Sequence, residues 1–215
     1  MTGPAPAVEL LRRRIASAGD GRPGGSRVVV AIDGPSGSGK STFADALVRG
    51  CPAPVDLVRL DDVYPGWHGL ERGAQLAAHG LVEPWLHGRA GRAASWDWAH
   101  SQPGAARPVR PGRALVVEGC GAFDAVARIG GRPRRGAAAA VLRVWVEASD
   151  AVRKRAALDR DAGGFDPWWD VWDAQWRRYA ARTRARSAAD LVVRTSFRPS
   201  ATLARGDAAG TTVEA

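Results

Sequence analysis

Lysine is almost missing from this chain of 215 residues, although the chain is strongly basic. Lys40 and Lys154 are the only lysines, so nearly all of the formal charge of +9 comes from arginines scattered along the sequence. A nucleic-acid surface needs basic side chains gathered on one face, with aromatic side chains between them. Net charge without such a pattern supports only non-specific association. The charge therefore argues against a nucleic-acid-binding function.

Cysteine and long apolar runs are also scarce. Cys51 and Cys120 are the only cysteines, and their separation fits neither a disulfide framework nor a metal motif. No window approaches the eighteen or so consecutive apolar residues of a membrane span. The three arginines at 12–14 are not followed by the apolar stretch of a signal peptide. We therefore expect a cytoplasmic protein with one α/β domain and no membrane partner, and the sequence leaves a homo-oligomer open.

Apolar runs and helical patterns alternate along the chain. Residues 28–32 form a continuous, mostly β-branched run, which is typical of a strand buried on both faces. Alternation of strands and helices predicts a five-stranded parallel sheet with helices on both faces. The other expected strands lie at 55–60, 114–117, 141–146 and 190–193. Helices are expected near 40–49, 70–79, 150–161 and 168–184.

Several segments lie outside this alternation or interrupt it. Residues 1–26 predict a short amphipathic helix followed by a glycine-rich connector. Residues 84–112 are rich in glycine, proline and arginine, so we expect a long, irregular insert on the substrate side. Residues 198–215 are small and polar and predict a flexible tail. The expected domain is therefore 27–197, in which 150–176 forms a lid region.

The strongest motif directly follows the first expected strand. Residues 34–41, GPSGSGKS, match the phosphate-loop pattern G-x-x-x-x-G-K-[ST] in full. Glycines let backbone N–H groups turn toward phosphates, and the next helix points its positive end at the same anion. Lys40 is expected at the β- and γ-phosphates of ATP, and the Ser41 hydroxyl at Mg²⁺. The predicted ATP-binding residues are Gly34, Pro35, Ser36, Gly37, Ser38, Gly39, Lys40, Ser41 and Thr42.

Two further strands end in acidic residues, at the sheet edge where ligands bind. Asp61 and Asp62 follow the second strand, and Glu118 ends the third. Asp61 can take the proton of an attacking hydroxyl or bind Mg²⁺, and Glu118 fits the acidic position at the metal. An aspartate pair also caps turns, and strands often end in a charge. We predict Asp61 as the catalytic base, and Ser41, Glu118 and Asp61 as the metal site.

Basic residues recur near helical spacing in the expected helix at 150–161. Arg153, Arg155 and Arg160 are predicted lid residues that neutralise a transferring phosphoryl group. Arg160 and Lys40 are both predicted to be catalytic residues, together with an acidic base. A solvated helix face would give the same pattern.

Tryptophan occurs nine times and clusters late in the chain. Trp168, Trp172 and Trp176 stand four apart, a stripe that favours core or lid packing over substrate stacking. Trp96-Asp97-Trp98, followed by His100, lies instead in the insert. Aromatic rings with one acid and one histidine suit a flat, hydrogen-bonding ligand, although a simple loop anchor explains them almost equally well.

Taken in chain order, these motifs resemble the uridine kinase-like branch of the P-loop kinases. The segment 34–41 is similar to that family's phosphate loop, and Asp61-Asp-Val-Tyr64 resembles its D-x-F-Y element, in which the first aspartate is base and metal contact. Trp96-Asp-Trp98 with His100 is similar to its Y-D-F element and nearby histidine, which contact the nucleoside. Val117-Glu118-Gly119 resembles its E-G element, and residues 153–161 resemble its lid helix. Together the motifs cover residues 27–195.

The resemblance implies the P-loop NTPase fold, Mg²⁺ as cofactor, and substrate contacts by Tyr64, Trp96, Asp97 and His100. Val63 stands where the family has phenylalanine, tryptophans replace its tyrosine and phenylalanine, and the histidine comes one residue early. These departures lie on the substrate side. The prediction is an ATP-dependent kinase for a small alcohol, most readily a nucleoside. The alternative is a P-loop ATPase or regulatory switch that hydrolyses ATP.

Overall fold

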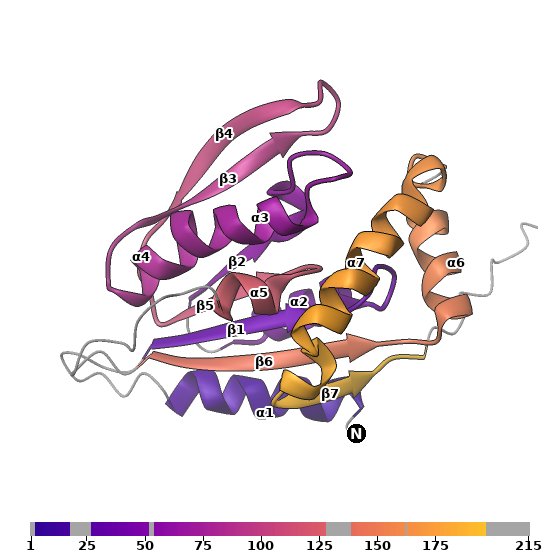
Figure 1. Ribbon diagram of the computed structural model, residues 1–215. Helices are drawn as coiled ribbons and strands as arrows, with labels where there is room; N and C mark the ends of the chain where they lie inside the picture. The colour runs from indigo at the N-terminus through magenta and orange to yellow at the C-terminus, as the bar shows by residue number, and fades with distance from the viewer. Residues whose placement is uncertain (1–2, 18–26, 52–53, 128–138, 162, 197–215) are drawn as a thin grey trace, which may run out of the picture.

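A five-stranded parallel sheet forms the centre of the computed structural model, in the order β2-β5-β1-β6-β7 (Figure 1). All five strands expected from the sequence are present, which confirms the predicted α/β class. The structure describes residues 3–17, 27–51, 54–127, 139–161 and 163–196. The strands are β1 (Arg27–Asp33), β2 (Val55–Arg59), β5 (Ala114–Glu118), β6 (Ala139–Glu147) and β7 (Leu191–Arg194).

Helices cover both faces of this sheet (Figure 1). One face packs against α1 (Pro4–Ser17) and α2 (Lys40–Arg49), and the other against α3 (Leu70–Ala77), α5 (Ala122–Ala127) and α7 (Trp169–Thr183). Side chains of β1 alternate between the two cores, as those of a strand must. The run at 28–32 is apolar throughout because both of its faces are buried.

The prediction that residues 84–112 are irregular was wrong. After the π-helical turn η2 (Ala78–Val82) and the short helix α4 (Glu83–Leu86), strands β3 (Gly91–Asp97) and β4 (Gln102–Val109) form an antiparallel hairpin. It projects above the main sheet in Figure 1. The strands could not be recognised from the sequence because this segment contains almost no β-branched residues, which are typical of strands. Ala93 and Val109 hold it in place because their side chains join the core.

The remaining elements lie near the carboxyl edge of the sheet or close to its last strand. They are η1 (Leu60–Asp62), α6 (Asp150–Arg160), η3 (Asp166–Trp168) and η4 (Ala185–Ala188). The helix expected within residues 1–26 is α1, whereas the connector after it and the tail at 198–215 lie outside the described residues. Within the described segments, no helix has the length and apolar character needed to cross a bilayer.

Candidate active site

The phosphate loop joins β1 to α2 at the carboxyl edge of the sheet. Gly34, Gly37 and Gly39 have φ angles of 146°, 75° and 90°, which glycine adopts without strain. A Cβ at Gly34 would collide with the carbonyl of Val146, and one at Gly37 with the carbonyl of Arg153. The glycines therefore shape the loop and also let β6 and α6 lie directly against it.

A cavity of about 240 Å³ lies on this loop. Lys40 is buried, and its Nζ donates a hydrogen bond to the Pro35 carbonyl at 2.9 Å. Burial opposes the charge of Lys40, but Cys120, Glu118 and Asp61 nearby raise its pKa above the ordinary value. An ammonium thus stays charged inside the cavity. The lining residues are Ser36, Gly37, Gly39, Lys40, Ser41, Thr42, Asp61, Glu118, Ala156 and Arg160.

Ser41 and Glu118 meet in the same cavity, where Ser41 Oγ donates to Glu118 Oε1 at 3.3 Å. The second carboxylate oxygen, Oε2, is buried and accepts no hydrogen bond from any described residue; the Nε of Arg59 is 3.8 Å away. Burial raises the pKa of Glu118 to about 7. Mg²⁺ takes few protein ligands and keeps water and phosphate oxygens around it. A hydroxyl beside a carboxylate with a free oxygen fits this ion.

Asp61 lies in η1, directly after β2, and lines the phosphate cavity and a second cavity of about 300 Å³. Ser36 and Arg160 are the other residues that line both. The indole Nε1 of Trp98 donates to the backbone carbonyl of Asp61 at 2.9 Å, which fixes this turn. Asp62 is not among the lining residues of either cavity. Asp61, Ser36 and Arg160 therefore mark where the two cavities meet.

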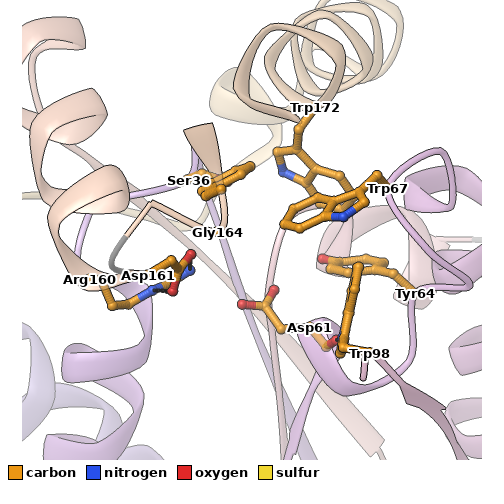
Figure 2. Close-up of a pocket in the computed structure, with 10 residues that line it drawn as sticks. Ser36, Asp61, Tyr64, Trp67, Trp98, Arg160, Asp161, Gly164 and Trp172 are labelled. Carbon is orange, nitrogen blue, oxygen red and sulfur yellow. Dashed lines mark hydrogen bonds and ion pairs between the residues drawn. The ribbon is translucent and has the colours of Figure 1, made fainter. Parts of the chain in front are cut away.

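Aromatic rings form much of the wall of the second cavity, which we call the aromatic cavity (Figure 2). Trp67 is central, because it stacks on Phe165 with a centroid distance of 5.1 Å and lies 4.8 Å from Trp98. Tyr64 is buried and donates to the Cys120 carbonyl at 2.7 Å, and burial raises its pKa well above the ordinary value. Such walls suit a flat or apolar ligand. The lining residues are Ser36, Asp61, Tyr64, Trp67, Trp98, Arg160, Asp161, Gly164, Phe165 and Trp172.

Of the four predicted substrate-binding residues, the structure brings only Tyr64 into this wall. Trp96, Asp97 and His100 do not line the cavity. Asp97 lies 2.8 Å from His100 at the end of the hairpin, and the hydrogen bond from His100 lowers the pKa of Asp97. This pair is exposed and satisfied within its own turn. The pair therefore has no place in the wall of the aromatic cavity, and its contact with a substrate stays a prediction.

Trp67, Trp98 and Phe165 line the cavity instead. Trp98 belongs to the pattern recognised in the sequence but was not among the four predicted residues, and Trp67 and Phe165 were not identified at all. Trp67 follows Tyr64 by three residues in the loop after η1, so its position beside a recognised motif was the available signal. Phe165 had no such signal. It reaches the cavity only because the turn before η3 brings it against Trp67.

The three predicted lid arginines go to different places. Arg160 lines both cavities and forms a two-bonded pair with Asp161, at 2.9 and 3.0 Å. Arg153 is buried between the rings of Trp169 and Trp176. The arginine also pairs with two aspartates, Asp150 at 2.7 Å and Asp173 at 2.8 Å.

Arg155 is 80% exposed and lies 3.7 Å from Asp159. Of the three predicted lid arginines, only Arg160 therefore lines the phosphate cavity and the aromatic cavity. Arg153 instead joins α6 to α7, which is why helical spacing alone misplaced it.

The three tryptophans of the predicted stripe, Trp168, Trp172 and Trp176, also lie in different surroundings. Trp172 lines the aromatic cavity and Trp168 stacks on Trp67 at 5.8 Å, whereas Trp176 packs on Trp145. The favoured interpretation, core packing, is confirmed for Trp172 and Trp176, because Trp172 belongs to the hydrophobic core and Trp176 packs against it.

Asp33, the last residue of β1, holds the site together and was not identified from the sequence. Its buried carboxylate accepts hydrogen bonds from the N–H groups of Gly34, Gly121 and Phe123 at 2.7, 3.1 and 2.9 Å. The hydroxyl of Tyr179 donates to it at 2.5 Å. Burial raises the pKa of Asp33. The sequence feature that could have identified Asp33 is the one that identified Glu118, a single acidic residue at the end of an apolar strand.

Tyr179→Phe should lower the free energy of unfolding by about 1–3 kcal/mol, because a buried carboxylate loses a hydrogen-bond donor. Urea denaturation measures this. Tyr64→Phe is the matched control, because the hydroxyl that it removes donates to a neutral carbonyl, that of Cys120. It should lower the free energy of unfolding by less, about 1 kcal/mol. Equal losses in the two variants would show that the bond to Asp33 has no special importance.

Two solved structures have a fold similar to that of this chain. A "possible uridine kinase" from Bacillus stearothermophilus aligns with a TM-score of 0.51 and 16% identity, over 86% of this chain and 96% of that one. A "putative fructose transport system kinase" from Silicibacter sp. TM1040 aligns with a TM-score of 0.50 and 21% identity, over 89% and 98%. No family model and no curated protein matches the sequence. The likeness establishes a P-loop kinase-like fold.

Proposed function

We propose that this protein, which has the P-loop kinase-like fold, transfers the γ-phosphoryl group of ATP to a hydroxyl of a small molecule. The meeting of two cavities at Asp61, Ser36 and Arg160 supports this proposal most strongly. Hydrolysis onto water needs the phosphate cavity alone. An aromatic cavity that opens onto the same carboxylate gives an organic acceptor a place to bind.

Each residue around this junction has a role that follows from its position. The buried, charged ammonium of Lys40 neutralises negative charge on the phosphates during transfer. The backbone N–H groups of the loop donate hydrogen bonds to the phosphate oxygens. Asp61 accepts the proton of the acceptor hydroxyl as that oxygen attacks the γ-phosphorus. Arg160 lies at the same junction and stabilises the charge that develops there. Ser41 and Glu118 would hold Mg²⁺, which neutralises phosphate charge.

The acceptor is proposed to be a small alcohol with a flat body, of which a nucleoside is the leading example. Support comes from the rings of Trp67, Trp98 and Trp172 in the cavity wall, and from the fold likeness to a possible uridine kinase. Asp97 and His100 are hydrogen-bonded to each other and do not line the cavity. Recognition in this proposal therefore depends on stacking and shape.

Glu118→Gln should raise the Mg²⁺ concentration needed for half-maximal activity by roughly tenfold or more, because a carboxylate ligand becomes a neutral amide. A magnesium titration at saturating ATP measures the shift. Glu83→Gln, which changes a glutamate outside both cavities, is the control and should leave the titration unchanged. An unchanged titration in Glu118→Gln, or full activity in excess EDTA, would remove Glu118 from the metal site.

The proposed function is tested by a screen of the purified protein with labelled ATP against nucleosides, nucleotides, vitamins and sugars. Inorganic phosphate is measured in parallel in every reaction. We expect one group of flat alcohols to acquire the label. Release of phosphate at the same rate with and without every acceptor would favour the regulatory ATPase.

A further inference from the structure

Arg59 lies beside the proposed magnesium site, although it lines neither the phosphate cavity nor the aromatic cavity. It ends β2, and the parallel register of β2 and β5 pairs it with Glu118. Both side chains point to the face of the sheet that α2 covers, because Leu57 and Val116, two residues earlier on the same strands, contact that core. The register therefore puts a permanent cation next to the carboxylate proposed to bind Mg²⁺.

Asp45 is the second acidic neighbour of Arg59. It follows Ser41 by four residues on α2, so the two side chains lie on the same side of the helix, toward β2 and β5. The Nη2 of Arg59 donates to Asp45 Oδ1 at 2.5 Å, whereas its Nε is 3.8 Å from Glu118 Oε2. That oxygen is buried and accepts no hydrogen bond from the part of the chain that the structure describes. Arg59 is therefore bonded to one carboxylate and held just short of another.

We propose that Arg59 and Asp45 together set the affinity of this site for its divalent cation. Asp45 keeps the guanidinium away from Glu118 Oε2 and leaves that oxygen open to the metal. Without Asp45, the guanidinium can close the gap to Glu118 and occupy the oxygen that the ion needs. Arg59 is thus a positioning residue, which acts on the metal through Glu118. The inference rests on the proposed function, because that proposal assigns the metal to Ser41 and Glu118.

The exposure of the three side chains indicates how the charges act. The side chain of Glu118 is 2% exposed, compared with 37% for Arg59 and 45% for Asp45. An ion pair between half-exposed groups contributes little to stability, so Arg59 can change partners at small cost. A buried carboxylate, in contrast, needs a cation to offset its lost hydration. Arg59 and a divalent ion therefore compete for Glu118, and Asp45 shifts this competition toward the ion.

The test is a double-variant cycle of Arg59→Gln, Asp45→Asn and the two changes together. Arg107→Gln is the matched control, because Arg107 also pairs with a residue of β2, Asp56 at 3.8 Å, and does not line the phosphate cavity. Mn²⁺, which suits the same oxygen ligands as Mg²⁺, is titrated into the nucleotide-free protein. Electron paramagnetic resonance measures the free ion, and circular dichroism checks the fold of each variant.

We expect Asp45→Asn to weaken Mn²⁺ binding by roughly threefold or more, and Arg59→Gln to strengthen it by a similar factor. The double variant should bind Mn²⁺ as tightly as Arg59→Gln, because Asp45 acts through the guanidinium. Arg107→Gln should bind like the wild type.

A double variant that is weaker than Arg59→Gln by the full factor seen in Asp45→Asn would overturn the inference, because Asp45 would then attract the ion by its own charge. Unchanged affinity in all three variants would also overturn it and leave an ion pair that only joins α2 to β2. Neither ATP nor an acceptor is present, so these results do not depend on the acceptor screen. Failure of the wild type to bind Mn²⁺ would instead refute the metal site on which both proposals depend.

Discussion

Asp61→Asn is expected to reduce phosphoryl transfer by about 10²–10⁴-fold while ATP still binds, since the amide keeps the size of the carboxylate and loses its basicity. Asp61 is the acidic residue that lines both the phosphate cavity and the aromatic cavity without a cation bonded to its side chain in the described structure. ATP affinity by calorimetry and product formation with the best acceptor are measured on the same protein preparation.

Asp62→Asn is the matched control, because Asp62 follows Asp61 directly and lines neither cavity. Its activity should stay close to that of the wild type. An inactive Asp62→Asn beside an active Asp61→Asn would mean that the base is assigned one residue too early. Two active variants would place the base elsewhere and remove a main support of the kinase proposal. A joint fall in rate and magnesium affinity in Asp61→Asn would add a metal role.

Lys40→Ala should lower turnover on the order of 10²-fold or more, because the charge that follows the migrating phosphoryl group is removed. The only other lysine provides the control. Lys154 lies on α6 against the ring of Trp169, 5.4 Å from its centroid, and lines neither the phosphate nor the aromatic cavity. Lys154→Ala should keep wild-type turnover. Circular dichroism checks that both variants fold.

Near-wild-type turnover in a folded Lys40→Ala would exclude the phosphate loop from the mechanism. A loss of turnover in both variants, together with an altered circular dichroism spectrum in each, would show instead that removal of either lysine harms the fold.

The phosphate loop and the cavity on it could be predicted because the residues that form the loop are consecutive in the sequence. Residues 34–41 carry the loop, Lys40 and the Ser41 hydroxyl within one turn, and a buried strand before them sets their place in the sheet. Asp61 and Glu118 were predictable for a related reason. Parallel strands bring their carboxyl ends to one edge, so acids that end separate strands meet.

The aromatic cavity could not be predicted because its residues meet only through tertiary packing. Trp67, Trp98, Phe165 and Trp172 come from four segments, and their common cavity depends on how the hairpin and α7 pack. The hairpin itself was missed because glycine, proline and arginine predict a loop. The pattern around Trp96 was recognised, but Trp98, which directly follows β3, lines the wall and Trp96 does not.

Arg153 shows the same limit within a helix. Spacing places arginines on a helix and does not say which of them the neighbouring helix will bury. Asp150, Asp173 and two tryptophan rings contact Arg153, so its contribution is to packing between α6 and α7.

The coupling between ATP consumption and ester formation tests the central proposal most directly. With γ-labelled ATP and the best acceptor of the screen, ADP, inorganic phosphate and labelled ester are measured over the same time course. If phosphoryl transfer to an alcohol is the function, ester and ADP should appear one to one, with little inorganic phosphate. ADP that is matched by inorganic phosphate, at a rate no acceptor changes, would contradict it and identify an ATPase.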